Sequence, residues 1–335
     1  METLRFAKHQ ALGNDFLIAL MQPHEKAALD SLRLDWPTLT SQLCDRSCGI
    51  GADGLILAID TSATQPSVAS DALEASSAPQ VRQVRMTLFN SDGSSAEVSG
   101  NGLACLANEV ARTLVSSLES GEGAEGPDSI LELTVDTVDG ARRVTLSAEF
   151  ATTESGSVES VEPLAEVHMP HVAPGPGITT ALDEHISDAL GSVLRETGDV
   201  GNPHLVINAG RPINARDTAD LGAAFETHFP LGINVEFIWS TGHEDSDSAA
   251  PSSIGMSVWE RGAGLTQACG TGAVTAAVRA RDWGLVDLDS STVVAMPGGK
   301  ATVSIDSDGG HPVLSVWVEH LGDHEWPIHA PIRDA

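Results

Sequence analysis

Residues 256–272 read MSVWERGAGLTQACGTG, and they align without a gap with residues 86–102, which read MTLFNSDGSSAEVSGNG. The alignment pairs Cys269 with Ser99, and each of these residues stands directly before a Gly-x-Gly turn. After each turn, apolar residues recur at helical spacing, which predicts a helix that begins at the turn. Because chance rarely repeats a methionine, an aromatic residue and such a turn in one register, the sequence predicts two related halves.

A second, looser repeat supports the duplication. Gly13-Asn14-Asp15-Phe16 and Gly201-Asn202-Pro203-His204 each precede an apolar run. Short runs rich in Val, Ile and Leu surround both repeats and predict half-buried strands. Two related halves would bring two equivalent helix N-termini to one cleft, where small-molecule sites preferentially occur. We therefore predict an α/β protein with domains at 1–155 and 156–335 and a site between them.

The turn that follows Cys269 suits acid–base chemistry. Free backbone N–H groups at a helix start attract anions, and they also lower the pKa of a thiol placed there. The turn could therefore hold a carboxylate beside a reactive thiolate. The alternative is that Cys269 is only a small buried residue in a helix-capping turn, but its place in the repeat favours the catalytic interpretation.

Ser99 occupies the equivalent place in the first half. A serine at a helix start is ordinarily an N-cap, and only its alignment with Cys269 suggests a further role. Two groups that face each other across a bound carboxylate can invert an α-carbon, because one removes the α-proton and the other delivers a proton to the opposite face. The paired helix N-termini would stabilise the charge that gathers on the carboxylate in the transition state.

Composition limits the other possibilities. With 18 basic and 47 acidic residues, the chain has a formal net charge of −29, which disfavours nucleic acid and anionic membranes as partners. The N-terminus resembles no signal peptide and no apolar run is long enough to cross a membrane, so we predict a cytoplasmic protein. We also expect its four cysteines to be reduced: Cys44, Cys48, Cys105 and Cys269.

Several segments are not expected to contribute catalytic, cofactor-binding or metal-binding residues. Residues 61–80, 116–129 and 241–253 are rich in small and acidic residues, and we expect disordered insertions there. Gly49–Gly54 matches GxGxxG but runs into a strand-like segment instead of a helix, so we expect no dinucleotide cofactor. The Cys44/Cys48 pair and the histidines lack the spacing of metal ligands, and we expect no metal.

Eight segments, in order along nearly the whole chain, resemble diaminopimelate epimerases, which convert LL- to meso-diaminopimelate for lysine and cell-wall synthesis. The segments are Ala11–Phe16, Cys44–Gly54, Phe89–Ser94, Ser99–Gly102, Gly201–His204, Gly232–Phe237, Trp259–Gly262 and Ala268–Gly272. Each is weak alone, but the ordered set is specific.

The resemblance implies two pseudo-symmetric domains, each a curved mixed or antiparallel sheet around a central helix. It also implies a homodimer and a two-base mechanism without pyridoxal phosphate or another cofactor. The implied bases are Cys269 and Ser99, with His204 as a polar support near the site. The implied substrate-binding residues are Asn14, Asn90, Asn202, Asn234, Glu260 and Arg261, with the turns Gly100-Asn101 and Gly270-Thr271 holding the reacting carboxylate.

The sequence departs from the family pattern at Ser99, because the family has cysteine at both bases. An alcohol is a far weaker acid than a thiol, and Cys105 lies too far along the predicted helix to replace it. Three functions remain open: an epimerase in which Ser99 donates and relays a proton, a lyase related to hydroxyproline dehydratases, and a paralogue that binds its ligand without turnover.

Overall fold

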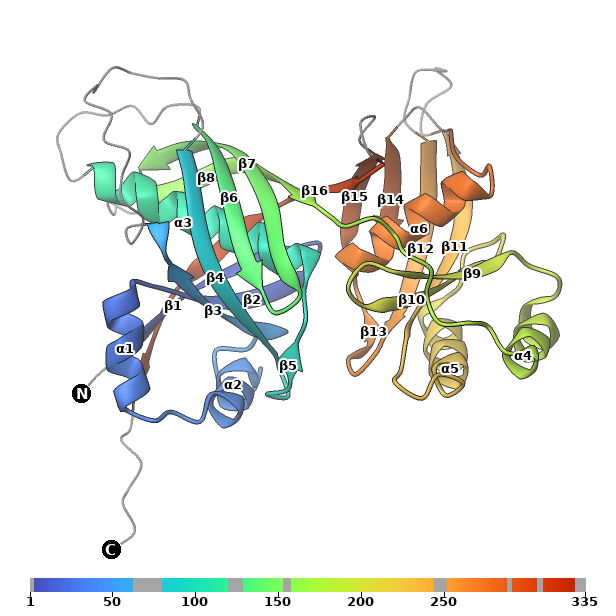
Figure 1. Ribbon diagram of the computed structural model, residues 1–335, viewed down its shortest axis with the longest axis horizontal. Helices are drawn as coiled ribbons and strands as arrows, with labels where there is room; N and C mark the ends of the chain where they lie inside the picture. Colours follow the sequence, from blue (N-terminus) through green and yellow to red (C-terminus); the bar gives the residue numbers. More distant parts are fainter. Residues whose placement is uncertain are drawn as a thin grey trace, which may run out of the picture.

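The computed structural model describes residues 3–62, 80–119, 129–152, 158–243, 252–287, 291–305 and 310–328 (Figure 1). Most of the three expected insertions, at 61–80, 116–129 and 241–253, lies outside these residues. In the described part of the chain, no helix is both long and apolar enough to span a membrane.

The first half contains a set of strands with one long helix and two short ones. These elements are β1 (Thr3–Ala11), β2 (Asn14–Met21), α1 (Pro23–Ser31), α2 (Trp36–Cys44), β3 (Gly54–Asp60), β4 (Gln80–Asn90), β5 (Ser95–Ala96), α3 (Gly100–Glu119), β6 (Ser129–Thr137), β7 (Gly140–Thr152) and β8 (Val158–His168).

From its first strand pair onward, the second half follows the same order, except that it has one helix in place of α1 and α2 and ends in one additional strand. A further helix precedes this strand pair. Its elements are α4 (Thr180–Leu190), β9 (Arg195–Asp199), β10 (Pro203–Asn208), α5 (Ala215–Glu226), β11 (Asn234–His243), β12 (Ser252–Glu260), β13 (Gly264–Thr266), α6 (Gly270–Asp282), β14 (Thr292–Met296), β15 (Gly299–Ile305), β16 (Pro312–Trp317) and β17 (Glu319–Pro327).

The strand pairing confirms the predicted duplication. β2 and β3 pair in parallel, as do β10 and β11 at the equivalent place in the second half. The pairs β4–β6 and β12–β14 are likewise both parallel, whereas the hairpins β6–β7 and β14–β15 are antiparallel. The fold is thus mixed α/β with two copies of one topology, as expected from the sequence.

Helices α3 and α6 lie at the centre of the two halves, as Figure 1 shows for α6 against its strands. The predicted apolar spacing is the reason, because Leu103, Leu106, Ala273 and Ala277 are all buried in one shared core. Burial of such side chains is the main stabilising contribution to a fold of this size. Each helix start is therefore held rigidly by the core behind it.

Two C-terminal strands link the halves. β16 pairs with β15 on one side and with β8 on the other, and β17 pairs with β1. The C-terminal end of the described chain therefore lies on the N-terminal half. The domain limits 1–155 and 156–335 stay a prediction.

A tight contact between two turns also joins the halves and leads to a stability prediction. A Cβ atom on Gly298, in the β14–β15 turn, would lie 1.8 Å from the carbonyl oxygen of Leu12, in the β1–β2 turn. We expect Gly298→Ala to lower the free energy of unfolding by about 1–3 kcal/mol, since one of the turns must move. Gly177→Ala is the control, because a Cβ at Gly177 meets nothing within 4 Å. Chemical denaturation of both variants tests this, and equal stabilities would contradict the account of this contact.

Candidate active site

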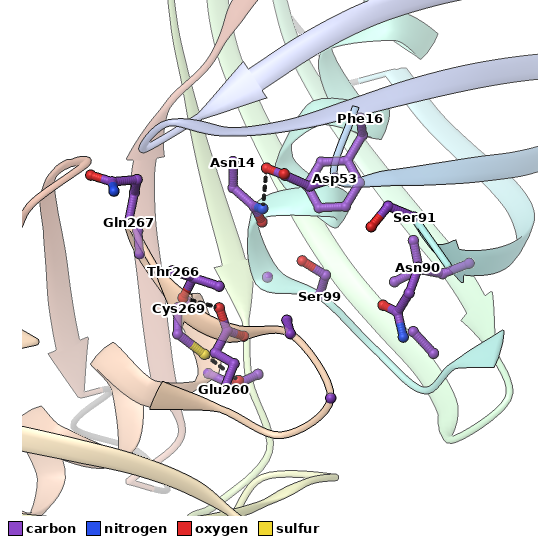
Figure 2. Close-up of a pocket in the computed structure, with 18 of the residues that line it drawn as sticks. Asn14, Phe16, Asp53, Asn90, Ser91, Ser99, Glu260, Thr266, Gln267 and Cys269 are labelled. Carbon is purple, nitrogen blue, oxygen red and sulfur yellow. Dashed lines mark hydrogen bonds between the residues drawn. The ribbon is translucent and has the colours of Figure 1, made fainter. Parts of the chain in front are cut away.

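A cavity of about 450 Å³ lies where the two halves meet, and Figure 2 shows its lining. Both of the repeated turns contribute to it. The expected site residues that line it are Asn14, Asn90, Ser99 and Gly100 from the first half and Asn202, Glu260, Cys269, Gly270 and Thr271 from the second.

The two turns approach each other very closely. A Cβ atom on Gly100 would lie 3.6 Å from the Cα atom of Gly270, and a Cβ on Gly270 would lie 3.4 Å from the backbone nitrogen of Asn101. The same buried side chain, Leu314, lies beneath both glycines. The N-termini of α3 and α6 therefore face one space, where their backbone N–H groups can bind one carboxylate.

Cys269 is the N-cap residue of α6, and its sulfur accepts a hydrogen bond from the backbone N–H of Gly272 at 3.4 Å. The side chain of Thr271 also lies 3.4 Å from the sulfur. The expected lowering of the thiol pKa is wrong. Burial, together with the charges of Glu260 and Glu236, raises the pKa of Cys269 well above its usual range, and this outweighs the two hydrogen bonds.

Glu260 lies beside Cys269 at the end of β12 and accepts a hydrogen bond from the Thr266 hydroxyl, which Figure 2 marks. It also accepts a hydrogen bond from the Cys269 thiol. Burial raises the pKa of Glu260 as well. The two groups therefore share a low-dielectric site in which neither readily carries a negative charge. A cationic group in the cavity would favour a negative charge on this pair, so that the Cys269 thiol could lose its proton and become a thiolate.

Ser99 lies at the start of α3, as the repeat predicts, but its hydrogen bonding differs from that of Cys269. Its hydroxyl accepts a hydrogen bond from the backbone N–H of Gly102 at 3.1 Å, which is the contact of an ordinary N-cap. In Figure 2, Ser99 and Cys269 border the cavity from opposite halves of the molecule. Cys105 is fully buried in the core and does not line the cavity.

The comparisons with known proteins agree with this geometry. Residues 197–319 match the family model for diaminopimelate epimerase. The chain is 32% identical to a diaminopimelate epimerase from Alkalilimnicola ehrlichii, with 98% of this chain and 99% of that protein covered. It is 35% identical to another from Heliobacterium modesticaldum, with 82% and 83% covered. The chain belongs to the diaminopimelate epimerase family.

Membership of the diaminopimelate epimerase family makes the protein an isomerase. The fold also resembles a solved hydroxyproline epimerase from Agrobacterium vitis with bound trans-4-hydroxy-L-proline. The TM-score is 0.55 at 15% identity, with 98% of this chain and 94% of that chain covered. At this identity the likeness concerns the fold alone.

Four residues that the diaminopimelate epimerase resemblance suggested do not line the cavity: Asn101, His204, Asn234 and Arg261. The Asn234 amide instead accepts from the backbone N–H of Arg261 at 2.9 Å and donates to the Pro203 carbonyl at 3.2 Å. Asn234 thereby fixes the loop that carries Glu260 and Arg261. The side-chain amide oxygen of Asn101 is buried and makes no hydrogen bond with the residues that the structure describes.

Arg261 spans the two halves of this diaminopimelate epimerase family member. It forms an ion pair with Glu97 at 2.8 Å, and the two side chains are 31% and 46% exposed. At that exposure the pair is worth little to stability. A ligand carboxylate could therefore replace Glu97 at small cost.

Sequence reasoning missed several polar residues at the site, and three of them contact residues that were predicted. Asp53 lines the cavity and accepts a hydrogen bond from the Asn14 amide at 2.8 Å. Thr266 binds Glu260, and Glu236 lies behind Cys269. Asp53 and Glu236 fall within segments shared with the diaminopimelate epimerases, which was the available signal, whereas nothing marked Thr266.

The ligand atoms of His204, Glu236 and Cys269 lie within 4.8 Å of one another, a grouping that could hold a metal ion. However, His204 Nδ1 and Glu236 Oε1 are only 2.6 Å apart. Two such ligands of one tetrahedral zinc would be separated by about 3.3 Å, given metal–ligand bonds of about 2.0–2.1 Å. The distance fits a shared proton instead.

Proposed function

We propose that the protein interconverts LL- and meso-diaminopimelate by moving a proton at one α-carbon, with Cys269 and Ser99 on opposite faces of that carbon. The observation that carries the proposal is the close approach of the two turns, Gly100 to Gly270, over one cavity that both residues line. The reacting carboxylate would accept hydrogen bonds from both helix N-termini. This contact strengthens as charge develops in the transition state.

In this proposal, substrate binding generates the base. The α-ammonium group enters beside Glu260 and Cys269, whose anionic forms are disfavoured by burial. Its positive charge favours loss of the Glu260 proton to solvent, and the resulting carboxylate can accept the thiol proton through their hydrogen bond. The thiolate then removes the α-proton.

Ser99 would supply the proton on the opposite face. Its hydroxyl accepts from the Gly102 N–H, which leaves its own proton free to point into the cavity. A hydroxyl is a weak acid, so this step limits the rate in our proposal, and water can restore the proton afterwards. The site is therefore chemically asymmetric, with a strong base on one side and a weak donor on the other.

A product assay separates the remaining functions. We expect purified protein to convert LL-diaminopimelate to the meso form, as followed by chiral chromatography. Dehydration of trans-4-hydroxyproline without epimerisation would indicate the lyase alternative. Thermal stabilisation by diaminopimelate without any product would indicate a binding protein. Either of these two outcomes would overturn the proposal.

Arg261 is proposed to bind the distal carboxylate of diaminopimelate. We expect Arg261→Gln to raise KM by about 10- to 100-fold with a smaller change in kcat, since hydrogen bonds to charged groups contribute about 1.5–3 kcal/mol. The exposed Arg211, which donates a hydrogen bond to the carbonyl of Pro212, provides the control Arg211→Gln. Steady-state kinetics of both variants test the assignment, and an unchanged KM in Arg261→Gln would refute it.

We further propose that the protein acts in the cytoplasm as a homodimer, in the synthesis of lysine and peptidoglycan precursors. The family resemblance supports these points. Light scattering after size-exclusion chromatography tests the dimer, and a mass near the 34.9 kDa of one chain would exclude it.

A further inference from the structure

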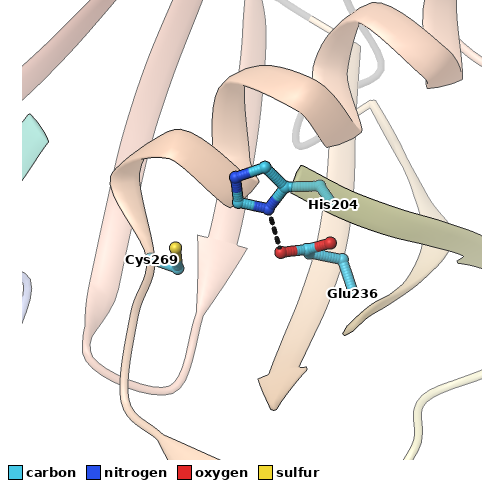
Figure 3. Close-up of side chains that lie close together, drawn as sticks. All are labelled: His204, Glu236 and Cys269. Carbon is cyan, nitrogen blue, oxygen red and sulfur yellow. Dashed lines mark hydrogen bonds and ion pairs between the residues drawn. The ribbon is translucent and has the colours of Figure 1, made fainter. Parts of the chain in front are cut away.

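A buried polar network extends from Cys269 into the second half. His204 at the start of β10 and Glu236 on β11 have side chains with no exposed area, and their Nδ1 and Oε1 atoms are 2.6 Å apart. Figure 3 shows both side chains beside the first turns of α6, on the same side as the Cys269 thiol. The second carboxylate oxygen of Glu236 is buried and makes no hydrogen bond with the described part of the chain. The proposed mechanism does not use Glu236.

Three side chains connect Glu236 to the sulfur, and we name them the polar chain: His204, Asn202 and Thr271. The Asn202 amide nitrogen donates to the Thr271 hydroxyl at 3.3 Å, so its oxygen faces His204 Nε2 at 3.1 Å. That ring nitrogen must therefore carry a proton. Because the Thr271 hydroxyl already accepts one bond, its single proton can be donated to the sulfur 3.4 Å away.

The proton that Glu236 and His204 share sets the direction of the hydrogen bonds along the polar chain. Both ring nitrogens of His204 face oxygen atoms. With a proton on Nε2, the short contact at Nδ1 needs one further proton, shared with Glu236. Without that proton, a neutral ring bonded to Glu236 would have to accept from Asn202. The amide would then turn over, and Thr271 would donate to Asn202 instead of the sulfur.

At the equivalent positions of the first half, the described residues form no such network, which provides an internal comparison. A Cβ on Gly272 would lie 2.7 Å from Glu236 Oε1, whereas a Cβ on the equivalent Gly102 would lie 3.2 Å from Ile56 Cδ1. The strand registers agree, because Glu236 and Ile56 each lie two residues beyond the start of the parallel pairing. An isoleucine thus stands where the second half has a buried carboxylate.

The histidine has an apolar counterpart as well. His204 pairs with the first residue of β11, and Phe16 pairs with the first residue of β3 at the same point of the repeat. Phe16 lines the cavity on the side of Ser99. Among the described residues, a carboxylate and a histidine therefore lie beside the thiol, whereas apolar residues occupy the equivalent positions beside the hydroxyl. This difference links the two polar residues to the function of Cys269.

We propose that Glu236 is a positioning residue that keeps the polar chain aimed at the Cys269 sulfur, and so lets the thiolate form when substrate binds. The inference rests on the proposed function. The same residue also has a competing effect, because the negative charge of Glu236 by itself raises the pKa of Cys269 and disfavours a thiolate. The two effects change the pKa of Cys269 in opposite directions. We expect the polar chain to dominate, since Glu236 shares its proton with His204 whereas Thr271 contacts the sulfur directly.

The test compares Glu236→Leu, which removes the partner of His204 Nδ1, with Glu236→Gln, whose amide N–H can still donate to that nitrogen. It also compares Thr271→Val with Thr271→Ser, which remove and keep the last hydroxyl of the polar chain. Glu196→Gln is the control, because Glu196 is half-exposed in the same half and pairs with Arg279 at 3.4 Å. The readouts are kcat, KM, the pH profile of kcat/KM, and the rate of Cys269 alkylation by iodoacetamide. Alkylation is measured by mass spectrometry in a Cys48→Ser background, since Cys48 is exposed.

We expect Glu236→Leu and Thr271→Val to lower kcat by about tenfold with KM changed less than about twofold. In both, the alkylation profile of Cys269 should move to higher pH, and farther than in the conservative variants Glu236→Gln and Thr271→Ser, whereas Glu196→Gln should match the parent protein. Faster alkylation of Glu236→Leu, or a shift to lower pH, would show that only the charge of Glu236 acts and would overturn the proposal. So would an unchanged profile.

Two further outcomes are covered. If Glu236→Leu does not fold, as judged by its thermal transition, the Thr271 pair decides alone, because equal profiles for Val and Ser contradict the polar chain. If the parent protein epimerises nothing but the alkylation profiles shift as expected, the proposed function fails while the positioning role of Glu236 stands.

Discussion

Cys269→Ala should abolish turnover of diaminopimelate, with a loss of about 10²–10⁴-fold or more, because general acid–base groups contribute on that scale. Among the described residues that line the cavity, only Cys269 has both a neighbouring proton acceptor, Glu260, and hydrogen-bond donors that contact its sulfur. Its loss leaves no nucleophilic base on that face. Initial rates of meso-diaminopimelate formation measure the effect.

The matched control is Cys48→Ser, because Cys48 is exposed and does not line the cavity. We expect it to keep the full rate. Thermal melting of Cys269→Ala in the presence of diaminopimelate should still show stabilisation, since the helix N-termini that hold the carboxylate are intact. Substantial turnover by Cys269→Ala would remove the mechanism.

Ser99→Cys should raise the rate by roughly tenfold to 100-fold, because a thiol is a much stronger acid than a hydroxyl and this side limits the reaction. The substitution keeps the N-cap, since a cysteine caps α6 in the same way at the equivalent turn. The parent protein should also exchange the α-hydrogen of one epimer with solvent faster than it inverts that epimer. In Ser99→Cys this excess of exchange over inversion should shrink.

Two controls define this result. Ser95→Cys places a thiol on an exposed position of the same segment and should leave the rate unchanged. Ser99→Ala should lose turnover, because it removes the donor. If Ser99→Ala were as fast as the parent, Ser99 would be only a helix cap, and another group would have to protonate the substrate.

The repeat in the sequence predicts the fold well, for a physical reason. Ser99-Gly-Asn-Gly and Cys269-Gly-Thr-Gly both cap helices whose apolar faces must be buried, and this dictates two similar halves with α3 and α6 at their centres. The same logic brings both turns to one cavity. What local patterns do not show is how the halves are joined, because β16 and β17 pair with strands far away in the sequence.

The electrostatics of the site were harder to predict. A helix start by itself lowers the pKa of a thiol, yet the pKa of Cys269 is raised by burial and by two carboxylates. One of these, Glu236, sits in an apolar strand where periodicity indicates only a buried position. The ion pair between Arg261 and Glu97 likewise depends on the approach of the two halves. Such effects follow from tertiary contacts and not from the local pattern.

Incorporation of deuterium from D2O tests the central claim most directly, namely that one face of the α-carbon meets Cys269 while the other meets Ser99. The protein is incubated with LL-diaminopimelate, and the products are separated and analysed by mass spectrometry and NMR. We predict that meso-diaminopimelate carries solvent deuterium at the one inverted α-carbon and protium at the other. Meso product that retains protium at both α-carbons, or the complete absence of inversion, would contradict the account.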